Sequence, residues 1–128
     1  MKRASILLLA LSLGVTMLGI GSPASAGDDD VERSGSCSES SDWKLKLGEE
    51  NSGIEVEFEV DQNANGDKWR VVLKHDGDRF FSGKRTTKGP SGSFEVRRVV
   101  KNTAGKDRIA ARARNLSTDE VCRGRASF

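Results

Sequence analysis

Residues 54–60 alternate strictly between apolar and acidic side chains, in the order Ile-Glu-Val-Glu-Phe-Glu-Val. Successive side chains of a β-strand point to opposite faces of a sheet, so this pattern predicts a strand with one buried face and one solvated face. A polar stretch follows at residues 61–67, and a second alternating run begins at Trp69. Two such runs joined by a turn that contains Asn and Gly predict a strand pair around which a small sandwich forms.

The same period of two recurs along most of the chain. Asp76-Gly77 favours a tight hairpin turn, and the run at 97–100 breaks the alternation, which indicates a bulge. Seven short strands without helical periodicity predict an all-β, seven-stranded antiparallel β-sandwich, with a five-stranded barrel as the alternative. We predict these strands at residues 43–47, 54–60, 69–73, 79–83, from 94, 109–113 and 121–128.

The N-terminal segment predicts export. A basic start, an apolar run at residues 4–20 and the ending Ala24-Ser25-Ala26 are typical of a signal peptide, which we place at residues 1–26. An uncleaved membrane anchor is the alternative. Residues 27–41 are rich in Asp, Ser and Gly and nearly without apolar side chains, which predicts a flexible leader. Residues 42–128 then form the β-sandwich domain of a secreted, extracellular protein with no membrane span after cleavage.

The formal net charge of +2 belongs to the predicted signal peptide. Without Lys2 and Arg3 the 21 basic residues become 19, which equals the 19 acidic residues. Most acidic residues precede Gln62 and most basic residues follow it. The charge of the exported chain is therefore near zero but unevenly distributed.

Cys37 and Cys122 are the two cysteines of the chain. Disulfides persist in exported proteins, so we predict a bond that ties the N-terminal segment to the last strand. A disulfide that closes so long a loop stabilises the fold by about 4–5 kcal/mol in the chain-entropy model. His75 is the single histidine. Two bonded cysteines and one histidine are too few for a metal site built from soft ligands.

The strand number, and the position of Trp69 on the third predicted strand, are the features that carry a resemblance. Over residues 42–128 the chain resembles the immunoglobulin-like and fibronectin type III-like sandwiches, and it looks most like small secreted single-domain proteins of high-GC Gram-positive bacteria. The resemblance implies an immunoglobulin-like sandwich with Trp69 in its core. The chain departs from that pattern because its cysteines are not on strands two and six, and because it has no Tyr for a tyrosine corner. Such a resemblance in fold implies no particular activity.

Residues 61–67, Asp-Gln-Asn-Ala-Asn-Gly-Asp, match the opening D-x-N-x-N-G of a calcium loop, in which alternate oxygens converge on one ion. The candidate metal ligands are Asp61, Asn63, Asn65 and Asp67. The twelfth position is Val72 in place of the expected Glu, and Asp119 or Glu120 from a neighbouring loop is a candidate for the missing carboxylate. A plain turn is the alternative, because Asn, Asp and Gly are common turn residues.

A second candidate site is basic. If the third, sixth and seventh predicted strands share a sheet, their outward side chains form one positive surface. Its members are Lys68, Arg70, Lys74, Arg108, Arg112, Arg114, Arg123 and Arg125. Clustered cations attract polyanions such as wall teichoic acids, anionic lipid surfaces or nucleic acid. Nucleic acid is the least supported of these, because no aromatic residues are interleaved for base stacking. Ordinary solvated strand faces with cross-strand partners are the alternative.

Catalysis has little support in the sequence. His75 stands alone beside a hairpin turn, and the chain has no G-x-S-x-G motif. We therefore predict a non-enzymatic, monomeric binding module that contacts an anionic envelope polymer or a protein partner and needs no cofactor. A calcium-stabilised extracellular domain is one alternative. A secreted enzyme inhibitor that presents residues 86–90 is another.

Overall fold

A computed structural model describes residues 29–128 of the chain, so the predicted signal peptide at 1–26 lies outside the described residues. The described part is all-β and contains no helix. None of its segments is therefore a helix long and apolar enough to cross a membrane. The strands are β1 (Val31–Ser36), β2 (Asp42–Glu50), β3 (Gly53–Asp61), β4 (Lys68–His75), β5 (Asp78–Thr86), β6 (Ser93–Lys101), β7 (Arg108–Asn115) and β8 (Val121–Ser127).

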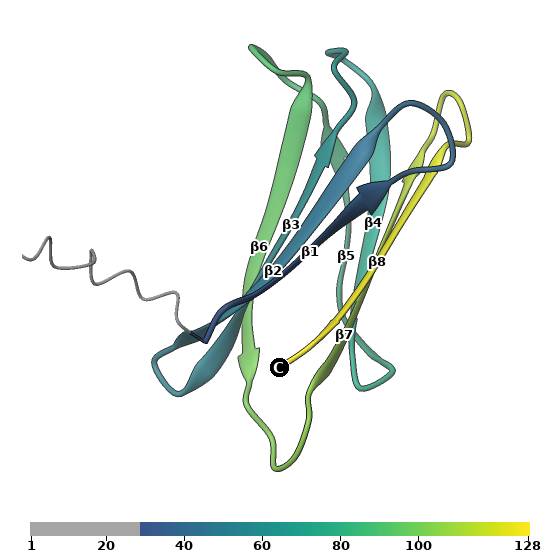
Figure 1. Ribbon diagram of the computed structural model, residues 1–128. Coiled ribbons are helices and arrows are strands. Elements are labelled where there is room, and N and C mark those ends of the chain that lie inside the picture. The colour runs from purple at the N-terminus through teal and green to yellow at the C-terminus, as the bar shows by residue number, and fades with distance from the viewer. Residues whose placement is uncertain (1–28) are drawn as a thin grey trace, which may run out of the picture.

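The strands form two four-stranded antiparallel sheets. Sheet A has the order β1-β2-β3-β6, and sheet B has the order β5-β4-β7-β8. Figure 1 shows the two sheets facing each other, with β1 and β2 approaching β8 along one margin. The prediction of an all-β fold with antiparallel sheets is confirmed.

The predicted number of seven strands is wrong, because β1 is an eighth strand. It lies within the segment predicted to be a flexible leader and pairs with β2 from Val31 opposite Leu47 to Ser36 opposite Asp42. The side chains in the middle of β1 are exposed. Backbone hydrogen bonds to β2 and the neighbouring disulfide at Cys37 therefore hold this strand, and apolar burial contributes little.

The core lies between the sheets and follows the alternation of the sequence. Sheet A contributes fully buried side chains such as Phe58, and sheet B contributes Trp69 and Leu73. The Trp69 ring packs against Phe94 with centroids 6.0 Å apart, and its Nε1 donates a hydrogen bond of 3.0 Å to Gln62 Oε1. Trp69, the largest fully buried side chain, thus has a hydrogen-bond partner for its one polar side-chain atom, as buried Trp usually does.

One margin of the sandwich is closed by Trp43 of β2. A Cβ atom at Gly35 of β1 would lie 3.0 Å from the Trp43 indole, and one at Gly124 of β8 would lie 2.7 Å from it. The distance at Gly124 is shorter than real Cβ contacts, so a side chain there would displace the indole, and the contact at Gly35 is already tight. The two glycines let the indole fill the space between the edges of the two sheets.

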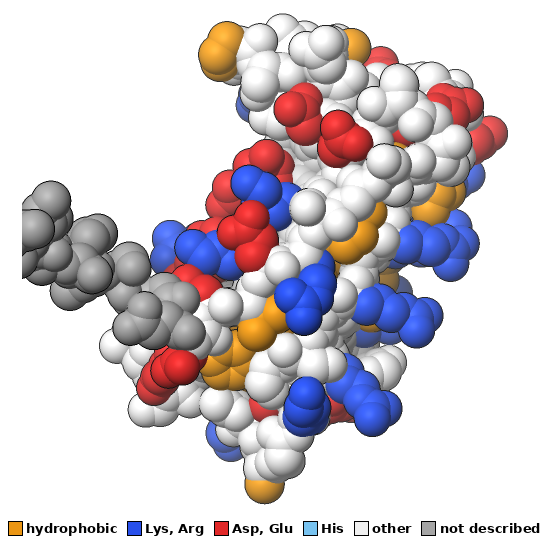
Figure 2. Space-filling view, in the orientation of Figure 1, with side chains coloured by type: hydrophobic (Ala, Val, Ile, Leu, Met, Phe, Trp, Pro, Cys, Tyr) orange, Lys and Arg blue, Asp and Glu red, His pale blue; other side chains and the backbone are white. Residues whose placement is uncertain are grey.

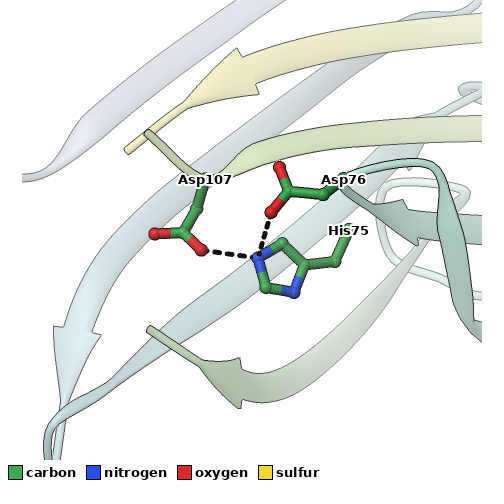
Figure 3. Close-up of side chains that lie close together, drawn as sticks. All are labelled: His75, Asp76 and Asp107. Atoms are coloured by element: carbon green, nitrogen blue, oxygen red, sulfur yellow. Dashed lines mark hydrogen bonds and ion pairs between the residues drawn. The ribbon is translucent and has the colours of Figure 1, made fainter. Parts of the chain in front are cut away.

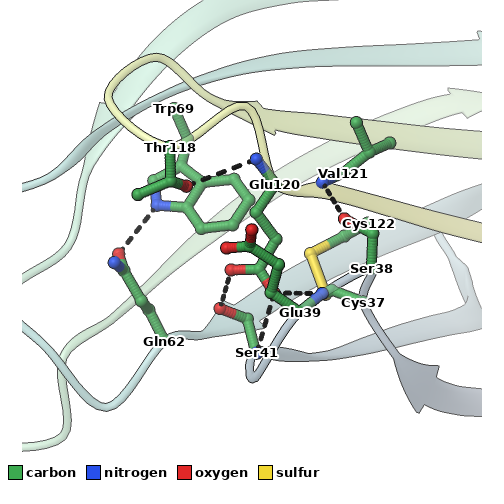
Figure 4. The surroundings of a disulfide bond; sticks show 10 residues. All are labelled: Cys37, Ser38, Glu39, Ser41, Gln62, Trp69, Thr118, Glu120, Val121 and Cys122. Atoms are coloured by element: carbon green, nitrogen blue, oxygen red, sulfur yellow. Dashed lines mark hydrogen bonds between the residues drawn. A yellow bond between two sulfur atoms is a disulfide. The ribbon is translucent and has the colours of Figure 1, made fainter.

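The Cys37–Cys122 disulfide joins the residue after β1 to β8, as predicted. Glu120, only 3% exposed, reinforces the same end of the molecule. Its carboxylate accepts hydrogen bonds from the backbone N–H groups of Glu39 (3.0 Å) and Ser41 (2.9 Å) and from Ser41 Oγ (2.6 Å). Figure 4 shows these bonds beside the disulfide. A covalent bond and a buried carboxylate therefore fix the β1–β2 turn to sheet B.

The bulge predicted at residues 97–100 is wrong. The pairing of β3 with β6 runs without a shift from Gly53 opposite Lys101 to Asp61 opposite Ser93, and the irregularity lies instead between β4 and β5 at Leu73/Lys74. The alternation breaks because Arg98 lies opposite the buried Val56, on the inner side of β6, and yet is exposed. Its guanidinium carbon lies 4.5 Å from the centroid of the Phe81 ring, so a cation–π contact replaces an aliphatic one there.

Candidate functional site

The basic residues predicted to share a surface do lie on one sheet, because β4, β7 and β8 are neighbours in sheet B. Over residues 68–75, 108–115 and 121–127 these strands carry Lys and Arg and neither Asp nor Glu. Their outward positions alternate with buried ones such as Val71, Ala113 and Cys122. We call this outer surface of sheet B the basic face; it contains Lys68, Arg70, Lys74, Arg108, Arg112, Arg114, Arg123 and Arg125.

Strand β5 adds Arg79 and Lys84 to the basic face, and sequence reasoning misses both. Five positions separate these residues, so strict alternation would place them on opposite faces. The register shift at Leu73/Lys74 leaves Phe80 unpaired and sets Arg79 opposite Lys74 while Lys84 lies opposite Arg70. A bulge of this kind brings both cations to the same side of the sheet.

Like charges lie directly opposite one another across the basic face. Arg112 is opposite Arg123, and Arg70 lies between Arg114 on one side and Lys84 on the other. Opposed like charges on neighbouring strands lower stability. Within residues 29–128, the ion pair that involves a cation of this face joins Arg114 Nη1 to Asp119 Oδ1 at 3.0 Å, at the margin of the sheet. The middle of the basic face thus consists of cations without an acidic partner.

A groove of about 670 Å³ opens on the basic face. Its floor includes the small apolar side chains of Val72 and Ala110, and five cations surround it: Lys74, Arg79, Arg112, Arg123 and Arg125. Figure 2 shows Lys and Arg gathered along the β8 side of the molecule, whereas acidic and basic side chains are mixed over β1 and β2. The arrangement suits an extended anion lying across the strands.

The outer face of sheet A differs, because three of its cations, Lys44, Lys46 and Arg97, have acidic partners. Lys44 lies 3.9 Å from Glu32. Arg97 pairs with Glu55 and lies 3.8 Å from Glu57. The hydrogen bond from Arg97 lowers the pKa of Glu55, whereas the neighbouring Glu55 carboxylate and burial raise the pKa of Glu57.

The predicted calcium loop uses its carboxylates within the fold. Asp61 Oδ1 accepts a hydrogen bond of 3.0 Å from the backbone N–H of Asn63, and this bond stabilises the turn in which both residues lie. Asp67 Oδ2 accepts bonds from the amides of Asn115 (2.9 Å) and Gln62 (2.6 Å), and these two amides lower the pKa of Asp67. Ion binding by Asp61, Asn63, Asn65 and Asp67 stays a prediction.

The two residues proposed to complete that loop have other partners. Asp119 pairs with Arg114, and both oxygens of Glu120 accept hydrogen bonds from the β1–β2 turn. Asp119 has a positive φ of 64°, which belongs to the tight connection between β7 and β8. The structure therefore assigns both carboxylates to holding turns.

Sequence reasoning also misses a cluster around the single histidine. His75 ends β4, and its Nε2 lies 2.6 Å from Asp107 Oδ1 and 3.4 Å from Asp76 Oδ2. Burial alone would raise the pKa of Asp107. The hydrogen bonds from Thr103 and His75 outweigh this effect, so the pKa of Asp107 lies below its usual value. Residues 75 and 107 are far apart in sequence, and no local motif signals that they meet.

Comparison with known proteins gives no assignment. No protein-family model matches the chain. Searches of curated proteins and of solved structures find no significant match. The function must therefore be inferred from the surfaces of the molecule.

Proposed function

We propose that the protein is a secreted, non-enzymatic binding module that holds an anionic, phosphate-bearing polymer of the cell envelope on its basic face. The observation that supports this most is the row of opposed cations in the middle of sheet B, with Arg112 opposite Arg123. Folding does not require a surface of one sign, because exposed charges of either sign satisfy the outward positions of a strand. A polyanion would remove the repulsion that these cations have in the free protein.

The composition of the basic face favours phosphate among anions. Most of its members are arginines, and a guanidinium group binds phosphate through two parallel hydrogen bonds. Neighbouring strands are about 4.8 Å apart, and outward residues of one strand are about 7 Å apart. Cations at these spacings can contact successive charges of a linear polymer, and release of its counterions then contributes to the affinity.

The proposal is tested with linear polyphosphate as the probe. Isothermal titration calorimetry at low salt compares the oxidised protein with the variant R112Q/R123Q, and K44Q/K46Q on sheet A is the matched control. We expect the first variant to bind at least about tenfold more weakly, because two charge-assisted contacts are lost. Equal affinities of the two variants, or no binding by the natural protein, would overturn the proposal, and the second result would favour a protein partner.

The resemblance to immunoglobulin-like sandwiches and the export of the chain belong to the same proposal. Two antiparallel four-stranded sheets and the buried Trp69 support the first. The disulfide fits an extracellular location, where such bonds persist. Mass spectrometry of the exported protein tests the second: we expect a chain that begins at Gly27, and a retained N-terminal segment would contradict cleavage after Ala26.

A further inference from the structure

His75, Asp76 and Asp107 form a compact group of ligand-type side chains at one end of the sandwich, which we call the His75 cluster. One ligand atom from each residue lies within 4.8 Å of the other two. His75 is the last residue of β4 and Asp76 lies in the β4–β5 turn, whereas Asp107 ends the connection between β6 and β7. Figure 3 shows both carboxylates directed at the same ring nitrogen, Nε2. The cluster lies outside the groove of the basic face.

Asp107 is unusual because it is fully buried and only half satisfied. Its Oδ1 accepts hydrogen bonds from Thr103 Oγ1 (2.6 Å) and the Thr103 backbone N–H (3.2 Å) in addition to the contact with His75. Its Oδ2 is the one buried side-chain polar atom in residues 29–128 that has no hydrogen-bond partner. Buried polar atoms are almost always paired. Figure 3 shows the unpartnered Oδ2 turned away from His75, so Oδ1, with its three contacts, is the Asp107 oxygen that faces the cluster.

Asp76 is held in place before any ligand arrives. Its backbone N–H donates to the carbonyl of Arg108 (2.8 Å), and its Oδ1 accepts from the Arg108 N–H (2.8 Å). The remaining oxygen, Oδ2, is the one that faces His75. Asp76 also takes a positive φ of 49° in the turn. The backbone of β7 thus fixes one carboxylate of the cluster and leaves a single oxygen free.

We propose that the His75 cluster is a binding site for a first-row divalent cation, Zn²⁺ above all, with His75, Asp76 and Asp107 as its ligands. Zinc binds imidazole nitrogen and carboxylate oxygen at about 2.0–2.2 Å, so tetrahedral ligand atoms lie about 3.4 Å apart. The His75–Asp76 distance of 3.4 Å already fits this spacing. The His75–Asp107 distance of 2.6 Å is that of a hydrogen bond, so these two ligand atoms must move apart to reach the same spacing around an ion.

The presence of an imidazole ligand selects among cations. Calcium and magnesium take oxygen ligands, whereas imidazole suits zinc and its neighbours. Three protein ligands leave a fourth position for water. A cavity of about 520 Å³ lies beside Asp76, and Gly77, Lys106 and Arg108 complete its lining. These two cations lower the affinity for the ion and favour an anion as the exchangeable fourth ligand.

The bound ion would join the β4–β5 turn to the β6–β7 connection, at the end of the sandwich opposite the disulfide. A ligand that binds only the folded state stabilises it by mass action. The bound ion would therefore be a reversible cross-link between these two connections, whereas the disulfide is a covalent cross-link at the other end. The site does not depend on the proposed polyanion binding, because its ligands are not members of the basic face.

The test uses the oxidised protein without a histidine tag, in a buffer that does not chelate metals. Calorimetric titration with ZnCl₂ is expected to give one site per chain, and Tm is expected to rise by about 5 °C or more at zinc concentrations far above Kd. Loading with Co²⁺ adds a spectroscopic signature, because visible absorption of tetrahedral Co²⁺ reports its ligands. H75A and D76N are expected to abolish all three signals, and D78N, a neighbouring carboxylate, is the matched control.

Asp76 is exposed, so D76N preserves the fold even if a substitution at the buried Asp107 does not. Absence of a zinc signal in the natural protein would overturn the proposal. Zinc binding that survives in H75A/D76N would also overturn it, because the ion would then be adventitious and bound elsewhere.

Discussion

The outer faces of the two sheets are built by the same alternation and differ in what their charges meet. On sheet A, Lys46 lies opposite Glu32 and Glu57 and forms an ion pair of 3.4 Å with Asp30. On sheet B, Arg112 lies opposite Arg123. Alternation decides that a side chain points to solvent, but register decides whether it meets an opposite charge. Sheet A also has one opposed like pair, Glu59 and Glu95, but its cations stabilise the fold through ion pairs, whereas sheet B keeps its cations available.

The energies involved are small enough for both arrangements to persist. An exposed ion pair contributes about 0.2–1 kcal/mol, and opposed like charges cost a similar amount. The core and the disulfide contribute far more, so the fold tolerates the unpaired cations of sheet B. Their uniform sign is the feature for which we propose a polyanionic partner.

Reversal of a charge on sheet A should have the largest effect on stability. K46E would place an acidic side chain among Asp30, Glu32 and Glu57, so the free energy of unfolding should fall by about 1–2 kcal/mol. Urea denaturation of natural protein and variant at low salt measures the difference. An unchanged midpoint would show that the ion pairs of sheet A contribute nothing.

The same reversal on sheet B should act in the opposite direction. R112E would face Arg123 with an opposite charge, so the free energy of unfolding should rise by about 0.5–1 kcal/mol. R112Q is the control, and it should give a smaller gain because it only removes the repulsion. Denaturation at low and high salt checks both variants. A loss of stability in R112E would contradict the account of the basic face.

The smallest effects concern two adjacent carboxylates of sheet A. Because Arg97 lowers the pKa of Glu55, ionised Glu55 adds stability above pH 4.5, and this is lost as the pH falls through the folded-state value. Since Glu55 and burial raise the pKa of Glu57, the stability that protonated Glu57 supplies is lost as the pH rises through its folded-state value.

At pH 7, E55Q should therefore lower the free energy of unfolding, and E57Q should raise it, each by about a few tenths of a kcal/mol. Both differences should shrink toward pH 3, where the natural carboxylates are protonated. Thermal melts of the two variants at several pH values measure this. The same sign of change for both variants at pH 7 would refute the assignment.

Much of the fold could be predicted from residues with strong local signals. The alternation from Ile54 to Val60 marks β3, and the two cysteines of a chain predicted to be exported mark the disulfide. The basic strands could also be predicted, because most of their outward positions carry Lys or Arg. Strand β1 could not, since it buries few of its side chains and depends on backbone pairing with β2.

The parts of the candidate sites that escaped prediction depend on contacts between distant residues. Arg79 joins the basic face only because of the register shift beside Leu73, and no sequence motif reports that shift. Asp107 reads as an ordinary loop residue, and its burial against His75 follows from the packing of two connections at one end of the sandwich. Register and packing, more than composition, determine both features.

The salt dependence of polyphosphate binding tests the central claim most directly. For a polyanion bound through several cations, the logarithm of the binding constant falls linearly with the logarithm of the salt concentration, by about 0.7–0.9 for each charge neutralised. We predict that R112Q/R123Q reduces the magnitude of this slope by about 1–2, whereas K44Q/K46Q leaves it unchanged. Equal slopes for the two variants would show that the basic face is not where the polyanion binds.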